Sequence, residues 1–274
     1  MKTLLKSRVE LQKAGRWDID FHLPAEGVKK FNASLLRRVD DVADIAKDKR
    51  DPTRKPESVF QYIDISSVDV TVGTISNPQD IEGSEAPSRA RKVVRAFDLL
   101  ISTCRPTRGA IAVVPPSLHN QIASTGFSIV RAHDDVNPFY LHYALRLPST
   151  LEQFRKWSTG SSYPAILDDD VAKTLIPVPD ADEQDRISQA LMRAAGDRSE
   201  AIHAADLIWQ RTLNDIFIGL SRSSADAAIA PERQLEMPHT IAAIRETLRT
   251  LPSLTIDRNG NDSAQISLDE LGLV

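Results

Sequence analysis

The sequence predicts an α+β fold, in which a mixed, mostly antiparallel domain is followed by one long α-helix and a small C-terminal extension. Short β-prone segments separated by turn residues fill the first two thirds of the chain. After Asp182 the spacing of apolar residues changes to the period of a helix and keeps it for more than thirty residues. We therefore expect a domain over residues 1–180, a long helix over 181–220, and a linker with a small extension over 221–274.

The composition is that of an ordinary globular protein without a strong overall charge. The chain has 274 residues, of which 41% are hydrophobic and 26% charged, and its net charge is −4. This charge gives no global cationic field, so any nucleic acid must bind through a local patch. The single cysteine, Cys104, excludes an internal disulfide framework and favours a reducing compartment, and its apolar surroundings predict a packed thiol. With no signal peptide and no apolar run of about 20 residues, we expect a cytoplasmic protein without a membrane span.

The domain is predicted from alternating and periodic apolar patterns. Apolar and polar residues alternate over Trp17–Phe21, which predicts a strand, and the spacing over Ala25–Ala46 predicts a helix broken near 37–41. Later apolar runs bounded by turn residues predict strands at Val59–Ile65, Asp69–Ile75, Val93–Ser102 and Gly109–Val114, and a strand over Gln121–Thr125 and Phe127–Arg131 that Gly126 interrupts. The last part should be helical from Pro138 to Arg146 and from Ser149 to Ser158, followed by a short turn or helix at Asp168–Leu175 and an extended Ile176–Pro179.

The long helix begins at Asp182, which we expect to be the N-cap, and runs to about Ile218. Some 36 residues make a rod of about 55 Å, which a domain of this size cannot cover alone, so the helix needs a partner helix. The alternative is an ordinary core helix that folds back on its own domain. The residues assigned to the partner-facing stripe are Ile187, Leu191, Ile202, Trp209, Leu213 and Ile216. Beyond it we expect a short helix over 238–250 and a hairpin about Asn259-Gly260.

The sequence carries few signs of catalysis. Glycine-rich dinucleotide motifs, a Walker A lysine motif and a serine hydrolase elbow are all missing, and the six histidines show no metal-ligand spacing. The run Asp168-Asp169-Asp170 is a candidate cation site, although a solvated helix N-terminus explains it better. These observations favour a binding protein over an enzyme.

A basic segment on this acidic chain points to one class of ligand. Six cations fall within the twenty residues 89–108, namely Arg89, Arg91, Lys92, Arg95, Arg105 and Arg108. A compact, β-prone element with a local basic cluster is typical of a surface that faces nucleic acid. The alternative is a charged face that contacts only solvent.

Seven short motifs in order carry a resemblance to a known family. They are Tyr62–Val68 with Gly73–Ile75, Ala86–Arg91, Asp98–Thr103 with Arg105-Pro106, Ala123–Phe127, Tyr140–Tyr143, Gly160–Pro164, and Ile176–Pro179 leading to Glu183-Gln184 and Ile187. With these motifs, residues 16–218 resemble a half-length Type I restriction–modification DNA specificity subunit with a single target-recognition domain. Phe97 departs from the family pattern, which has glycine before the aspartate, so the turn there is expected to differ. Residues 221–274 match no pattern of the family.

The resemblance implies a function and its partners. Family members read short half-sites in double-stranded DNA, pair their long helices in antiparallel fashion and dock methyltransferase subunits. It implies a homodimer on a palindromic, bipartite site, with no cofactor in this chain because S-adenosylmethionine is held by the partner methyltransferase. Whether a restriction or translocase subunit joins is left open. The residues expected at DNA are Ser88, Arg89, Arg91, Lys92, Thr103, Arg105, Arg108, Ser161, Ser162 and Tyr163.

Two functions of other classes remain as alternatives. A stand-alone nuclease or methyltransferase would be active as an isolated chain, which an assay with metal or methyl donor would detect. An anti-restriction decoy would occupy the docking site of the methyltransferase without reading DNA. It would leave no footprint on a defined sequence.

Overall fold

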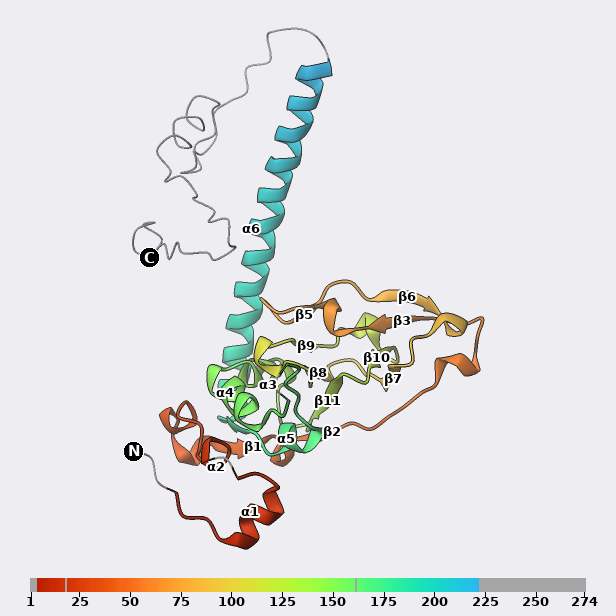
Figure 1. Cartoon of the computed structure of the whole chain (residues 1–274). Coiled ribbons are helices and arrows are strands. Elements are labelled where there is room, and N and C mark those ends of the chain that lie inside the picture. The colour runs from red at the N-terminus through yellow and green to blue at the C-terminus, as the bar shows by residue number, and fades with distance from the viewer. Residues whose placement is uncertain (1–3, 18, 161, 222–274) are drawn as a thin grey trace, which may run out of the picture. The chain divides into compact units, whose positions relative to one another are not determined.

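The structure is a computed structural model that describes residues 4–17, 19–160 and 162–221 (Figure 1). By their internal contacts the residues divide into two compact units, Met1–Ile202 and His203–Val274. The predicted linker, the helix over 238–250 and the hairpin about Asn259-Gly260 lie outside the described residues. The α+β class is confirmed, with a mixed set of sheets and a long helix near the end of the described chain.

Two four-stranded sheets form the framework of the first unit. The central sheet has the order β2-β11-β8-β9 and is entirely antiparallel; its strands are β2 (Ala43–Ile45), β11 (Phe127–Ala132), β8 (Leu99–Ser102) and β9 (Ile111–Val113). The outer sheet has the order β6-β3-β10-β7, with β6 (Gln79–Glu82), β3 (Val59–Ile63), β10 (Ile122–Ser124) and β7 (Ala90–Val93). Among the described strands only β3 and β10 pair in parallel, so the pairing there is mostly antiparallel, as predicted.

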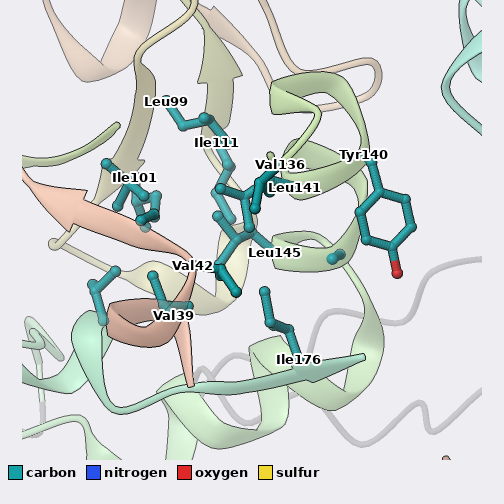
Figure 2. Close-up of a cluster of buried hydrophobic side chains, with 14 of the residues drawn as sticks. Val39, Val42, Leu99, Ile101, Ile111, Val136, Tyr140, Leu141, Leu145 and Ile176 are labelled. Carbon is teal, nitrogen blue, oxygen red and sulfur yellow. The ribbon is translucent and has the colours of Figure 1, made fainter. Parts of the chain in front are cut away.

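The central sheet is covered on both faces. Leu99 and Ile101 of β8 pack into a core with the helices, whereas the intervening Leu100 packs into a second core with residues of the outer sheet such as Ile63 and Ala123. Figure 2 shows the first of these cores. Alternate residues of a strand point to opposite faces, so a strand that is buried on both reads as a continuous apolar run.

Three helices of this unit line the first core. They are α3 (Pro138–Leu145), α4 (Pro148–Trp157) and α5 (Asp168–Ala172). Asn137 caps α3 by accepting hydrogen bonds from the backbone N–H groups of Phe139 and Tyr140. The Tyr140 hydroxyl donates to the carbonyl of Pro177 at 2.8 Å, and burial raises the pKa of that hydroxyl to about 12.

The remaining regular elements are short. Two further strand pairs are β1 (Leu36–Arg38) with β12 (Leu175–Pro177), and β4 (Val68–Asp69) with β5 (Thr74–Ile75). The first residues form α1 (Arg8–Ala14) and α2 (Ile19–His22). Single 3₁₀ turns occur at Val28–Lys30, Ala33–Leu35, Val39–Asp41, Pro52–Arg54, Ile65–Ser67, Gly83–Glu85, Pro106–Arg108 and Pro116–Leu118, and are numbered η1 to η8 in that order.

Four of the predicted elements are wrong or need dividing. Trp17–Phe21 is not a strand, because α2 begins at Ile19, and 25–46 is not a helix, because β1 pairs with β12 and β2 with β11. In both cases tertiary packing outweighs the local apolar pattern. The predicted strand 69–75 folds into β4, a turn and β5. The predicted strand 93–102 divides into β7 and β8 around a turn that contains Phe97.

The long helix α6 runs from Ala181 to Ser221, which at 41 residues corresponds to about 60 Å. Its cap is Asp180 rather than the predicted Asp182, since the Asp180 carboxylate accepts from the backbone N–H of Glu183 at 2.9 Å. Its first turns pack onto the domain through the buried Gln184 and through Ile187. Among the described helices, none has a stretch long and apolar enough to cross a membrane.

Candidate nucleic-acid interface

The turn between β10 and β11 brings several of the expected contact residues to one end of both sheets. The backbone N–H of Thr125 donates to the carbonyl of Arg89 at 2.8 Å. Thr103 donates to the carbonyl of Gly126 from its backbone N–H and from its hydroxyl, at 2.8 and 2.9 Å. The start of β7 and the end of β8 are thereby fastened to the same turn, which places Arg89 and Thr103 at one edge of the domain.

A second loop, over residues 159–166, is fastened to the same edge. The backbone N–H of Arg105 donates to the carbonyl of Pro164 at 2.7 Å, and that of Ile166 donates to Thr103 at 3.0 Å. The Arg105 guanidinium then lies 4.8 Å from the centre of the Tyr163 ring, in cation–π geometry. Residues 58 positions apart in the sequence thus form one stacked pair on the surface.

The exposed charges of this edge have no acidic partners. Arg89 and Arg108 are exposed, and among the described residues no carboxylate lies within ion-pair distance of Arg89, Arg105 or Arg108. The Tyr163 ring is 75% exposed, and Ser88 and Ser162 are exposed beside the cations. Ser161 lies outside the described residues. We call the group formed by Arg89, Thr103, Arg105, Arg108, Ser162 and Tyr163 the Arg105 cluster.

Two of the cations expected at DNA form hydrogen bonds and ion pairs within the fold. Lys92 donates from Nζ to the carbonyl of Phe127 at 2.6 Å, and its ammonium group lies 3.8 Å from the carboxylate of Asp168. Arg91 donates to the carbonyl of Ala90 at 2.8 Å and lies 3.6 Å from Asp51. Their half-buried side chains bridge β7 to neighbouring elements, and their contact with DNA stays a prediction.

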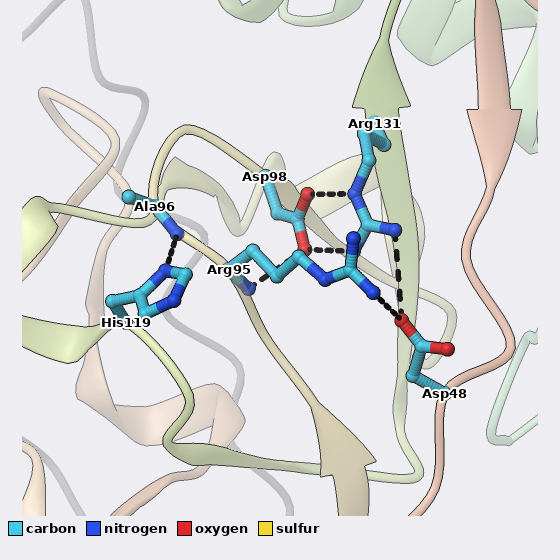
Figure 3. Close-up of polar contacts among 6 residues, drawn as sticks. All are labelled: Asp48, Arg95, Ala96, Asp98, His119 and Arg131. Carbon is cyan, nitrogen blue, oxygen red and sulfur yellow. Dashed lines mark hydrogen bonds and ion pairs between the residues drawn. The ribbon is translucent and has the colours of Figure 1, made fainter.

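A second cluster, which the sequence analysis did not identify, lies where β7 turns into β8 (Figure 3). Arg131 donates from Nε and Nη2 to the two carboxylate oxygens of Asp98, both at 2.8 Å, and Asp98 is 1% exposed. Asp48 lies 3.5 Å from Arg131 and 3.2 Å from Arg95. The hydrogen bond and charge of Asp98 raise the pKa of the Arg131 guanidinium. We call Asp48, Arg95, Asp98 and Arg131 the Asp98 cluster.

A signal for this cluster was present in the sequence. Asp98 directly precedes a fully apolar run, and a carboxylate in such a place needs a cation or several N–H donors. A pocket of about 400 Å³ lies beside the cluster and is lined by Phe97, His119, His133 and neighbouring residues. Phe97 takes a left-handed backbone conformation, with φ +69°, so the turn has the geometry that glycine adopts without strain.

Two further expectations concern Cys104 and the aspartate run. The Cys104 thiol is exposed, not packed, because the chain leaves the buried strand β8 at Ser102. The Asp170 carboxylate accepts from the backbone N–H of Leu167 and pairs with Lys173. These contacts belong to the N-terminus of α5 and not to a cation site. Among the described residues, no group of three or more His, Cys, Asp or Glu side chains is arranged to hold a metal ion.

The stripe assigned to a partner helix divides into two parts. Ile187 is half-buried and packs against the core of its own domain, and Leu191 is also half-buried. Further along α6 the apolar side chains are exposed, with Trp209 60% accessible. Ile202, Trp209 and Ile216 recur every seven residues, and so do Leu213 and Leu220, which is the spacing of a coiled-coil seam.

Comparison with known proteins gives homologues of one kind. No family model matches the chain. The specificity subunit of the Type I restriction enzyme HindI from Haemophilus influenzae is 30% identical over 116 residues, which cover 41% of this chain and 24% of that protein. The crystal structure of the HsdS subunit from Thermoanaerobacter tengcongensis is 35% identical with a TM-score of 0.53, over 72% of this chain and 51% of that one.

A second solved structure comes from work on the complex assembly and conformational transition of the Type I restriction–modification system. It is 36% identical with a TM-score of 0.55, again over 72% of this chain and 51% of that one. The chain thus spans about half the length of these solved relatives and about a quarter of the curated one. The matched part shares both sequence and fold with them, and the chain is a homologue of the Type I restriction–modification specificity subunits.

Proposed function

We propose that the chain is a sequence-specific DNA-binding subunit that directs adenine methylation or cleavage by partner subunits of a Type I restriction–modification complex. The observation that carries the proposal is the Arg105 cluster, whose cations have no ion-pair partner among the described residues and lie beside one exposed aromatic ring, on a homologue of specificity subunits. Specificity subunits are the non-catalytic members of such complexes. The chemistry is accordingly assigned to other chains.

Each part of the Arg105 cluster suits a different contact with a duplex. The planar guanidinium of Arg105 presents a fork of donors, which matches the O6 and N7 acceptors of guanine in the major groove. Stacking on Tyr163 limits the orientations of that fork, which lowers the entropy lost on binding. Arg89 and Arg108 are exposed point contacts for phosphates, and Thr103 positions the edge through its two hydrogen bonds to Gly126.

The exposed part of α6 supports a homodimer. One domain and one long helix correspond to half of the longer relatives, and two copies joined through the seam of Ile202, Trp209, Leu213 and Ile216 would supply the other half. A two-fold symmetric pair of antiparallel helices presents two identical readers, so its DNA site is a bipartite palindrome. The partner methyltransferase would carry S-adenosylmethionine, and this chain would need no cofactor of its own.

Methylation mapping of the host genome with and without this gene tests the proposal. We expect the methylated adenines of one bipartite, palindromic motif to disappear when the gene is deleted, and the purified chain with its methyltransferase to protect that motif from nuclease. Sedimentation of the full chain should report a dimer. A complex with the methyltransferase that protects no defined sequence would identify a decoy instead, and methylation by the isolated chain would identify an enzyme.

A further inference from the structure

A second group of exposed cations lies next to the strand that leads into the Arg105 cluster. The segment Lys47–Lys55 runs antiparallel to β7, where Lys49 is bridged to Lys92, the Arg50 N–H donates to the Arg91 carbonyl at 2.9 Å, and the Val93 N–H donates to Asp48 at 3.0 Å. Residues 48–50 of the segment therefore cover the β7 edge of the outer sheet, and the segment continues into η4, which packs against η6. Arg89 of the Arg105 cluster directly precedes β7.

The charges of this segment are unevenly compensated. It holds five exposed cations and two aspartates, of which Asp48 is paired with Arg95 and Arg131, and Asp51 with Arg91. Arg50 donates to the carbonyl of Asn120 at 3.0 Å. The other four cations make no side-chain hydrogen bond or ion pair within the described part of the chain; we call them the edge cations, and they are Lys47, Lys49, Arg54 and Lys55.

The position of Lys49 argues for an anion outside the protein. Lys49 stands directly opposite Lys92 on the neighbouring strand, and like charges in that position destabilise a sheet. The fold compensates Lys92 with the carbonyl of Phe127 and the carboxylate of Asp168, but it offers no such group to Lys49. In a chain of net charge −4, a group of exposed cations that make no side-chain hydrogen bond or ion pair within the described part of the chain suits a polyanion such as the phosphate backbone of a duplex.

We propose that the edge cations form a phosphate-binding surface that holds the backbone of double-stranded DNA beside the Arg105 cluster. The proposal rests on the proposed function, because the duplex it holds is the one that the Arg105 cluster reads. The edge cations meet phosphates and no base edges, so they add affinity equally for every sequence and set the salt dependence of binding. Discrimination between sequences stays with the Arg105 cluster.

The test measures the salt dependence of DNA binding by the full-length chain. Two double variants remove the edge cations in pairs, Lys47→Gln with Lys49→Gln, and Arg54→Gln with Lys55→Gln. A control, Lys29→Gln with Lys30→Gln, removes the same charge from exposed residues of η1, where Lys29 is ion-paired with Glu26 and the N-cap Gly27 donates to Glu152 of α4. Dissociation constants are measured by fluorescence anisotropy between about 50 and 200 mM salt, for a duplex with the target site and for a scrambled duplex.

Each lost phosphate contact lowers the slope of log K against log salt by about 0.9, so we expect each edge variant to lose close to 2. The loss should be the same for both duplexes, and the control should keep the wild-type slope. Thermal unfolding confirms that each variant is folded. Unchanged slopes in both edge variants, a loss equal to that of the control, or a loss on the target duplex alone would overturn the proposal.

The same measurement separates this proposal from the proposed function. If wild-type protein binds both duplexes equally and the edge variants still have a smaller salt slope, the phosphate-binding surface is supported and the proposed sequence recognition is wrong. If wild-type protein prefers the target duplex and the edge variants keep its salt slope, the proposed sequence recognition is supported and the proposed phosphate-binding surface is wrong. Absence of salt-dependent binding by wild-type protein overturns both.

Discussion

The Asp98 cluster and the Arg105 cluster use arginine side chains for opposite purposes, and we call them the paired end and the unpaired end of the domain. In the Asp98 cluster, Arg95 and Arg131 are paired with carboxylates, one of them buried. In the Arg105 cluster, Arg89 and Arg108 are exposed and Arg105 is half-buried, and none of the three has a carboxylate partner among the described residues. The difference teaches that a run of cations predicts neither binding nor stability until the positions of the acidic residues are known.

Asp98→Asn tests the paired end and should have the largest effect. The substitution removes the buried partner of Arg131 and leaves that guanidinium with only the exposed Asp48, so the free energy of unfolding should fall by up to about 3–5 kcal/mol. Urea unfolding measures the loss. Asp48→Asn is the matched control, because its pairs are exposed and should cost less than about 1 kcal/mol. Equal effects of the two variants would show that burial of Asp98 has no special energetic weight.

Burial also predicts a pH dependence at His142. Burial lowers the pKa of this imidazole to about 4, while its Nε2 lies 3.1 Å from the carbonyl of Ile111. The unfolded chain takes up a proton near pH 6.5 and the folded chain does not, so stability is lost as the pH falls from 6.5 towards 4. The shift corresponds to about 3 kcal/mol.

Urea unfolding as a function of pH checks this dependence. The carboxylates titrate in the lower part of the same range, so the informative quantity is the difference between wild type and His142→Gln, which cannot protonate. That variant should lose less stability than wild type between pH 6.5 and 4. Parallel pH profiles would show that His142 does not resist protonation in the fold.

Arg105→Ala tests the unpaired end, and Arg95→Ala is its control with the same change in charge. If Arg105 reads a base, its removal should weaken binding to the target duplex by about 1–3 kcal/mol and relax sequence preference at one position. Arg95 is engaged with Asp48, so its removal should change DNA affinity much less. Anisotropy titrations with target and substituted duplexes measure both. Equal losses for the two variants would mean that the two ends do not differ towards DNA.

The sequence predicted those parts of the fold and site that depend on local pattern. The strands β3, β8, β9, β10 and β11 and the helices α3, α4 and α6 follow from apolar periodicity, whereas β6 and most of β7 were not predicted. Most residues of the Arg105 cluster were named because they are polar and close to the family motifs. Long-range contacts decided the rest. Pairing of β1 with β12 replaced the expected helix, and Asp168 occupied Lys92 from 76 positions away. No local sequence pattern indicates such long-range partners.

Phe97 offers the smallest and most specific test of how the two ends are separated. It holds the turn between β7 and β8 at φ +69°, where a side chain costs about 1–2 kcal/mol relative to glycine. Its ring is 45% exposed and meets Phe139 edge to face at 6.1 Å, a contact that offsets part of this cost. Phe97→Ala removes the ring contact and keeps the strained backbone, whereas Phe97→Gly removes both.

The glycine variant should therefore be more stable than the alanine variant by about 1 kcal/mol, which is the reverse of their order in a helix. Urea unfolding of the two variants measures this difference directly, because neither has the ring. Their affinities for DNA should be equal, since the turn belongs to the Asp98 cluster and not to the Arg105 cluster. An alanine variant as stable as the glycine variant would mean that the turn relaxes to negative φ, and that the separation of the two ends does not depend on its left-handed geometry.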